Sequence, residues 1–119
     1  MAKGNPVGWF EILGKDAAKT QKFYKDLFGW PIDANNPMNY GMVQGDGFPV
    51  GGGVAGSQDG KPLVTVYVDV DDLQKTLDKA KSLGAEVIMP PMDVPAGPSI
   101  AQFKDPDGNI IGIMKPPAM

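Results

Sequence analysis

The chain of 119 residues contains no cysteine and no histidine. Without cysteine it can form no disulfide, and the side chains that most often bind zinc, iron and nickel are missing together. Only carboxylates, carbonyl oxygens and water remain as metal ligands, so any bound metal would be a hard cation. We therefore expect a domain whose hydrophobic core stabilises the fold without disulfides.

The sequence also lacks a basic cluster and a long hydrophobic run. Eleven Lys and Arg residues against fourteen Asp and Glu give a net charge of −3, which argues against a nucleic-acid or anionic-membrane partner. No apolar run approaches the ~20 residues that span a bilayer, and residues 1–10 lack the apolar region of roughly 7–15 residues found in secretion signals. We expect a cytoplasmic protein, with residues 1–119 forming a single domain.

The most distinctive stretch runs from Asp105 to Met114. Asp105-Pro106-Asp107-Gly108 predicts a tight reversal, because proline presets φ near −65° and glycine accepts a positive φ. A strand is expected directly after the turn, with Ile111 and Ile113 on its core side.

An internal repeat organises the rest of the chain. Asp16 and Gly29 have the spacing of a helix N-cap and C-terminal glycine, and Asp71 and Gly84 repeat that spacing 55 residues later. Alternating apolar residues predict strands near residues 7–13, 32–34, 39–44, 50–54, 64–70, 85–89, 99–104 and 109–114, with a stiff proline-rich loop over 90–98. Each half therefore reads β-α-β-β-β, with module one at about 5–56 and module two at about 62–115.

Side-chain periodicity predicts which faces are buried. Val64, Val66, Val68 and Val70 alternate with polar residues and are expected to face the core. The aromatic residues Phe23, Tyr24 and Phe28 follow the spacing of a buried helix stripe, so we expect core packing for them. The run Gly51 to Gly53 is interpreted as a bend in its strand, with close packing of another group against the backbone as the alternative.

These motifs together resemble the vicinal-oxygen-chelate superfamily of glyoxalase I, bleomycin-resistance proteins and extradiol dioxygenases. The likeness rests on the turn at 105–108, on Phe23-Tyr24-x-x-Leu27-Phe28-Gly29 and on Pro90 to Pro95, and it covers nearly the whole chain. The resemblance implies an α+β fold in which two βαβββ modules form a curved eight-stranded mixed sheet with the helices on its convex face. It also implies a homodimer, since resistance relatives build their pockets between two chains.

The positions that hold metal ligands in relatives carry no clear ligand here. By resemblance, the four positions fall at or near Trp9, within Gly51 to Gly53, at or near Thr65, and at Gly112. Glycine has no side chain with which to bind a metal. We therefore predict no metal and no cofactor.

The side chains on the inferred concave face suit a small-molecule trough instead, because aromatic and sulfur groups would surround a few polar tips. Aromatic residues and methionines in strands also fill cores or subunit interfaces, and that alternative stays open. The predicted ligand-binding residues are Trp9, Glu11, Tyr40, Met42, Thr65, Tyr67, Asp69 and Met114.

Three functions fit these residues. The first is metal-free capture of a flat or aromatic small molecule that stacks on Trp9 and Tyr67, with Glu11 and Asp69 selecting polar or cationic groups. The second is a lyase, isomerase or dioxygenase with an oxygen-ligand metal site or with acid/base chemistry at Glu11, the one weak catalytic candidate. The third is a non-catalytic interaction module whose trough is filled. The sequence favours the first and leaves open whether any reaction is catalysed.

Overall fold

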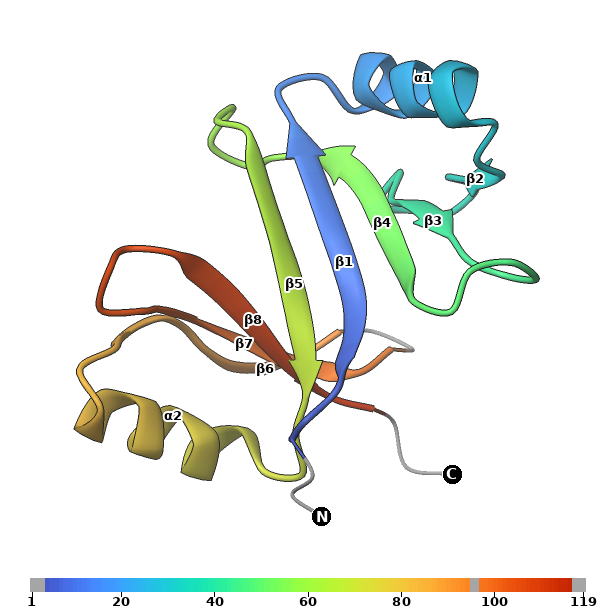
Figure 1. The fold of residues 1–119 in the computed structure, drawn as a ribbon. Coiled ribbons are helices and arrows are strands. Elements are labelled where there is room, and N and C mark those ends of the chain that lie inside the picture. Colours follow the sequence, from blue (N-terminus) through green and yellow to red (C-terminus); the bar gives the residue numbers. More distant parts are fainter. Residues whose placement is uncertain (1–3, 95–96, 117–119) are drawn as a thin grey trace. The chain divides into compact units, whose positions relative to one another are not determined.

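A computed structural model describes residues 4–94 and 97–116 of the chain (Figure 1). The elements are β1 (Val7–Gly14), α1 (Ala17–Phe28), β2 (Ile32–Asp33), β3 (Gly41–Val43), β4 (Gly51–Gly56), β5 (Leu63–Asp69), α2 (Leu73–Ser82), β6 (Glu86–Asp93), β7 (Ser99–Lys104) and β8 (Ile110–Lys115). The order β-α-β-β-β occurs twice. Parallel and antiparallel strand pairs both occur, so the predicted α+β fold built from two βαβββ modules is confirmed.

The described chain forms two compact units, one of residues 9–65 and one that joins residues 4–8 to the residues from 66 onward. In the first unit the strand order is β2-β3-β4-β1, and β1 runs parallel to β4. In the second unit the order is β5-β8-β7-β6, and β5 runs parallel to β8. The two orders correspond strand by strand, as the internal repeat predicts.

The ends of both helices follow from local side-chain chemistry. Asp16 caps α1, where its Oδ1 accepts a hydrogen bond from the backbone N–H of Lys19 at 3.1 Å, and Gly29 ends the helix with φ +70°. In α2 the cap is Asp72 and not the predicted Asp71. The chain stays extended for longer there, because the N–H of Val70 still donates to the carbonyl of Met114 in β8.

A hydrophobic core lies in the unit that contains α2. Its buried members are Val70, Leu73, Leu77, Ala101 and Ile113, so the prediction for Ile113 is confirmed. The predicted core face of β5 is wrong at Val64, which is 72% exposed, whereas Thr65 and Tyr67 on the opposite face are 3% and 5% exposed. Periodicity located the two faces of this strand but assigned burial to the wrong one at its start.

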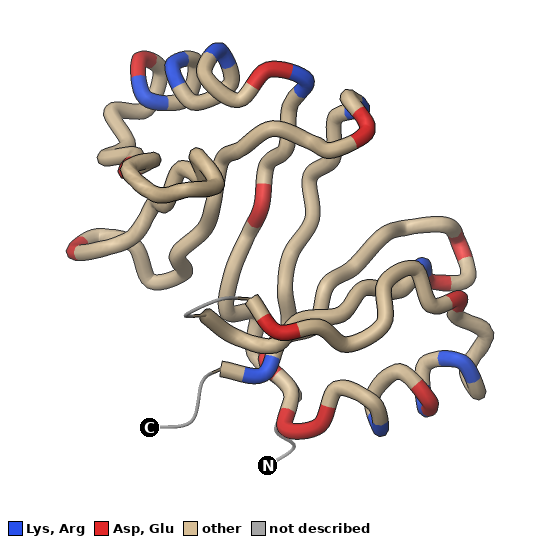
Figure 2. The backbone as a smooth tube through the Cα atoms, turned by 180° about the vertical axis from the view of Figure 1, so that it is seen from behind, with Lys and Arg blue, Asp and Glu red and all other residues tan. Residues whose placement is uncertain are grey.

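The apolar stripe of α1 is also less buried than predicted. Phe23 and Phe28 are 58% and 56% exposed, and α1 contributes no buried residue. Only Tyr24 of the three predicted aromatic core residues is half-buried. Lysines recur along both helices, interspersed with aspartates (Figure 2).

The proline-rich segment after residue 89 is partly strand and not a loop throughout. β6 continues to Asp93 through Pro90 and Pro91, with register shifts against β7 on both sides of Met89. β6 is the last strand in the order of its unit, and prolines are tolerated in edge strands because no neighbour needs their missing N–H. The prediction for residues 95–96 lies outside the described residues.

The turn at Asp105 is confirmed. The N–H of Gly108 donates to the carbonyl of Asp105 at 2.9 Å, and Gly108 adopts φ +97°. The Asp105 carboxylate accepts three hydrogen bonds, from the N–H groups of Asp107 and Asn109 and from the Asn109 side chain. Neither helix in the described ranges is long and apolar enough to cross a membrane.

Candidate functional site

The predicted site residues fall into two groups, one in each compact unit. The unit of residues 9–65 contains Trp9, Glu11, Tyr40, Met42 and Thr65, and the other unit contains Tyr67, Asp69 and Met114.

In the first unit, Tyr40 links two other predicted residues by hydrogen bonds. The indole Nε1–H of Trp9 donates to the Tyr40 hydroxyl at 2.8 Å, and that hydroxyl donates to Oε2 of Glu11 at 2.9 Å. The backbone of Tyr40 is held by Asn36, whose side chain accepts from the Tyr40 N–H and donates to its carbonyl. The result is a fixed, partly buried row of indole, phenol and carboxylate.

The glycines of β4 make this row possible. A Cβ atom on Gly53 would lie closer than 3.0 Å to the Tyr40 ring and hydroxyl, and one on Gly51 would lie 2.9 Å from the Trp9 ring. Gly52 lies in the same way against the ring of Phe10. Close packing against the backbone, the alternative explanation of the glycine run, is therefore what the structure shows.

Strand register places the remaining residue of β3 beside this row. Met42 pairs with Gly53, and Gly53 pairs with Glu11 on its other side. Residues that pair directly across strands share a face of the sheet, so Met42 lies on the same face as Glu11. Thr65 is buried, with 3% of its surface exposed.

In the second unit, the ring of Tyr67 lies on Gly112. A Cβ atom on Gly112 would approach three ring carbons of Tyr67 more closely than 3.0 Å, and the two residues are direct partners across β5 and β8. The Tyr67 hydroxyl accepts a hydrogen bond from Nε2 of Gln102 at 2.8 Å. Gln102 pairs with Gly112 from β7, and no sequence pattern marks it as a site residue.

Asp69 and Met114 are direct partners on the same two strands. The Asp69 carboxylate lies over Gly8, where a Cβ atom would meet both of its oxygens. Oδ1 of Asp69 is buried and accepts no hydrogen bond from any described residue. Its backbone is tied to the start of the chain, because the Asp69 N–H donates to the Pro6 carbonyl and its carbonyl accepts from Asn5. Asp69 therefore presents an acceptor oxygen that its own unit does not satisfy.

The residues at the inferred ligand positions do not fit a metal ion. The indole of Trp9 donates a hydrogen bond and offers no lone pair, while Gly53 and Gly112 each lie beneath a tyrosine ring. Within residues 4–94 and 97–116, no three acidic side chains gather closely enough to hold a cation. The places from which ligand side chains would project on β4 and β8 are filled by phenol rings.

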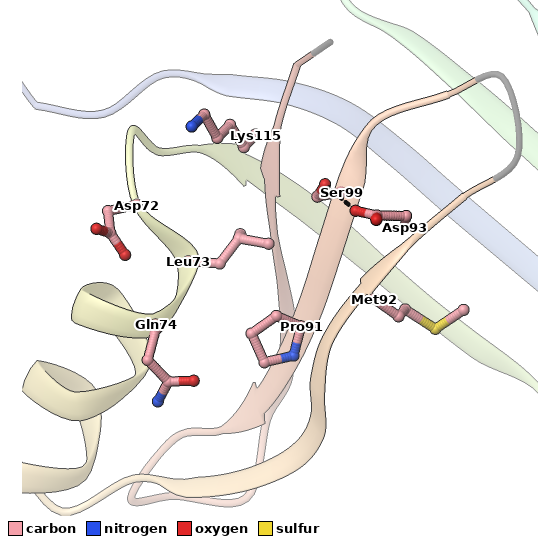
Figure 3. Close-up of a pocket in the computed structure, with 8 residues that line it drawn as sticks. All are labelled: Asp72, Leu73, Gln74, Pro91, Met92, Asp93, Ser99 and Lys115. Carbon is pink, nitrogen blue, oxygen red and sulfur yellow. Dashed lines mark hydrogen bonds between the residues drawn. The ribbon is translucent and has the colours of Figure 1, made fainter. Parts of the chain in front are cut away.

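A hollow of about 510 Å³ lies in the unit of residues 4–8 and 66 onward, and none of its lining residues is a predicted site residue (Figure 3). The start of α2 and the strands β6, β7 and β8 surround it, and Ser99 Oγ donates to Oδ1 of Asp93 within it. Its lining consists of Asp72, Leu73, Gln74, Pro91, Met92, Asp93, Ser99 and Lys115. Its lining has no aromatic residue.

Comparison with known proteins gives several relatives. The chain is 30% identical to a putative glyoxylase, CFP32, of Mycobacterium tuberculosis, over 93% of this chain and 45% of that protein. It is 30% identical to the anthracycline biosynthesis protein DnrV of Streptomyces peucetius, over 96% of this chain and 48% of that protein. The chain thus spans about half the length of these curated relatives. A glyoxylase-like domain-containing protein of Didymella fabae is 29% identical over 93% of this chain and 94% of its own length.

Solved structures show the same fold at low sequence identity. Methylmalonyl-CoA epimerase from M. tuberculosis superposes with a TM-score of 0.70 at 15% identity, covering 99% of this chain and 94% of the epimerase. The Mn(II)-bound glyoxalase from Novosphingobium aromaticivorans has a TM-score of 0.67 at 15% identity, over 97% of this chain and 40% of that one. The family model of the Glyoxalase/Bleomycin resistance protein/Dioxygenase superfamily matches residues 7–113, and the chain belongs to this superfamily.

Proposed function

We propose that the chain binds a flat, aromatic small molecule without a metal ion. The observation that carries this proposal is the pair of tyrosine rings that lie on Gly53 and Gly112. The resemblance to the superfamily implies that relatives carry metal ligands at these two positions. Here each position instead carries an aromatic ring whose hydroxyl is hydrogen-bonded to a neighbouring side chain.

The first unit offers a rigid aromatic surface. Trp9 and Tyr40 hold each other through a 2.8 Å hydrogen bond, so little side-chain entropy remains to be lost when a ligand stacks on them. Met42 adds a polarizable apolar side chain on the same face. Glu11 is held in one orientation by the Tyr40 hydroxyl. This combination suits a ligand with an aromatic plane.

In the second unit, Asp69 favours a ligand that offers a hydrogen-bond donor. A buried acceptor without a partner costs about 1–3 kcal/mol, and Oδ1 of Asp69 is such an acceptor among the described residues. A ligand that brings an ammonium or N–H group to this oxygen would recover that free energy. We therefore propose that a ligand of this unit carries a cationic or N–H group.

The relative DnrV supports this class of ligand. It is named for the biosynthesis of anthracyclines, which are flat, fused-ring molecules. Its match with this chain covers 96% of the chain, so Trp9 to Met114 lie within or close to the range compared. The relationship makes an anthracycline a reasonable first probe.

A second candidate is proton transfer at Glu11. The hydrogen bond from Tyr40 joins a phenol to a carboxylate at 2.9 Å, and such a pair can pass a proton between a substrate and the carboxylate. The third candidate is a non-catalytic interaction module whose trough is filled by its own side chains. The burial of Thr65 and Tyr67 supports it. We rank both below ligand capture.

Ligand capture is tested by binding of two probes, doxorubicin, which is flat and cationic, and anthraquinone-2-sulfonate, which is flat and anionic. Thermal unfolding and tryptophan fluorescence would be followed for wild type, Trp9→Phe, Asp69→Asn and the control Trp30→Phe. Trp30 is the other tryptophan and stacks on Tyr24, outside the proposed site. The pair of conservative variants separates loss of the site from loss of a tryptophan.

We expect doxorubicin to stabilise wild type and the Trp30→Phe variant equally. Trp9→Phe should bind roughly tenfold more weakly, because it loses the indole that stacks and that anchors Tyr40. Asp69→Asn should remove the preference for the cationic probe over the anionic one. Ligand capture is wrong if neither probe shifts the unfolding temperature at 1 mM, or if Trp9→Phe binds as tightly as the control. If the wild type turns over a substrate and Glu11→Gln does not, proton transfer at Glu11 is the better account of the function.

A further inference from the structure

Three polar side chains that line the hollow beside α2 form a row across the sheet. Asp93, Ser99 and Lys115 are direct partners on the neighbouring strands β6, β7 and β8. Direct partners across strands share a face of the sheet, and all three residues line the hollow (Figure 3). We call these three residues the charged row, because an acid and a base stand at its two ends.

The charged row continues the core face of this sheet. Ala101 lies two residues from Ser99 along β7, and Ile113 lies two residues from Lys115 along β8. Ala101 and Ile113 are buried in one hydrophobic cluster with residues of α2, and residues two apart in a strand lie on the same face. The buried face of the sheet therefore becomes polar near the point where α2 begins at Leu73, and the hollow lies there.

The two charges of the row do not neutralise each other. Neighbouring strands lie about 4.8 Å apart, so the backbones of Asp93 and Lys115 are separated by about 10 Å. Ser99 stands between them and donates a hydrogen bond to Oδ1 of Asp93, and no other described residue donates to that carboxylate. The described part of the chain gives Lys115 no ion-pair partner within 4.0 Å. The row therefore offers an oriented carboxylate at one end and an ammonium group at the other.

Apolar side chains complete the lining of the hollow. Leu73 is 7% exposed, and Figure 3 shows its side chain and the ring of Pro91 in the space between α2 and the strands. An apolar group of a ligand would be removed from water against these two residues. The volume of about 510 Å³ falls within the range of small-molecule sites. The hollow thus combines two opposite charges with an apolar surface.

We propose that the hollow binds a zwitterionic small molecule with an apolar side chain, of which a free apolar amino acid is the simplest example. The ligand carboxylate pairs with Lys115, the ligand ammonium pairs with Asp93, and the apolar side chain contacts Leu73. Two charge-assisted hydrogen bonds of about 2.8 Å each, with the amino acid between them, are comparable to the separation of the two ends of the row. The other acid of the lining, Asp72, already accepts a hydrogen bond from the N–H of Lys75 as the cap of α2. The inference does not depend on the proposed aromatic ligand, because no lining residue belongs to that site.

A ligand with a single charge would satisfy only one end of the charged row. A carboxylate alone would pair with Lys115 but gain nothing from Asp93, and an ammonium alone would do the reverse. The two charges therefore give the hollow a preference for zwitterions over singly charged molecules of the same shape.

The test is an NMR titration of the ¹⁵N-labelled chain, which detects weak binding and locates it. Three probes share one branched apolar chain: L-leucine carries both charges, 4-methylpentanoate carries only the carboxylate, and 3-methylbutylamine carries only the ammonium. Wild type should bind leucine in the millimolar range and about threefold more tightly than either singly charged probe, because each exposed ion pair contributes little. The amide signals of residues 72–74, 92–93, 99 and 115 should shift together.

Two charge-removing variants identify the groups that hold the ligand. Lys115→Gln should bind leucine no more tightly than 3-methylbutylamine, and Asp93→Asn should bind leucine no more tightly than 4-methylpentanoate. Lys81→Gln is the matched control and should bind like wild type, because Lys81 is an exposed lysine of α2 outside the hollow.

Three results would overturn the proposal. The first is that leucine at up to about 20 mM does not shift this group of amide signals. The second is that a singly charged probe binds wild type as tightly as leucine does. The third is that either charge-removing variant binds leucine as tightly as the Lys81→Gln control.

Discussion

Substitution of Gly112 by alanine tests whether a tyrosine ring fills the inferred ligand position on β8. The new methyl group would lie closer than 3.0 Å to three carbons of the Tyr67 ring. The ring has little room to move, because Tyr67 is 5% exposed and its hydroxyl is held by Gln102. Overpacking of this kind costs about 1–3 kcal/mol, and the lower entropy of an unfolded alanine returns about 0.4–1 kcal/mol. We expect a net loss of about 1–2 kcal/mol.

Urea unfolding followed by tryptophan fluorescence measures this loss. Gly4→Ala is the control, since a Cβ atom on Gly4 would meet nothing within 4 Å. In a Tyr67→Leu background, Gly112→Ala should cost at least about 1 kcal/mol less, which is the coupling of two residues in contact. The reasoning is refuted if Gly112→Ala is as neutral as the control, or if its cost is the same in both backgrounds.

Three further outcomes follow from local contacts. Asp72→Ala should lower the free energy of unfolding by about 1 kcal/mol because it removes the cap of α2, whereas Asp71→Ala should stay within about 0.5 kcal/mol. Tyr40→Phe should cost about 1–3 kcal/mol, because an indole N–H and a carboxylate each lose a partner. Hydrogen bonds from Asn109 lower the pKa of Asp105, so its contribution to stability is present above the unfolded pKa of ~3.9 and is lost as the pH falls through the lower folded value. Urea titrations at a series of acidic pH values should show this loss in wild type and not in Asp105→Asn.

Features set by neighbouring residues could be predicted from the sequence. The cap at Asp16, the positive φ of Gly29 and the turn closed by Gly108 each depend on a few consecutive side chains. The βαβββ repeat was visible for the same reason, because caps and strand alternation recur at a fixed spacing. The adjacent aspartates before α2 marked the limit of this reasoning, since a hydrogen bond between Val70 and β8 decides which of them is the cap.

Burial depends on partners far away in the chain, and here periodicity failed. The spacing of Phe23 and Phe28 defines a helix stripe but does not show whether the sheet has room for it. Gln21 occupies the sheet side of α1 with two hydrogen bonds to backbone carbonyls, so the aromatic residues lie outward. Val64 is exposed although its strand alternates clearly.

The sequence predicts which residues form the candidate site but not the hydrogen bonds that join them. The sequence placed Trp9, Glu11 and Tyr40 on one face, yet the hydrogen-bonded order in which they stand depends on the register of three strands. Gln102 carried no local signal, because the tyrosine that it contacts, Tyr67, is 35 residues away in the sequence. Asn36 is only four residues from Tyr40, but no sequence pattern shows that its side chain bonds the Tyr40 backbone. The glycine run was the strongest available clue to rings packed against the backbone.

Titration of the purified chain with Mn²⁺, followed by electron paramagnetic resonance, tests the central claim most directly. If phenol rings fill the ligand positions over Gly53 and Gly112, the signal of free Mn²⁺ should be undiminished up to millimolar concentration. One equivalent of tightly bound Mn²⁺, lost in Glu11→Gln or Asp69→Asn, would contradict the account.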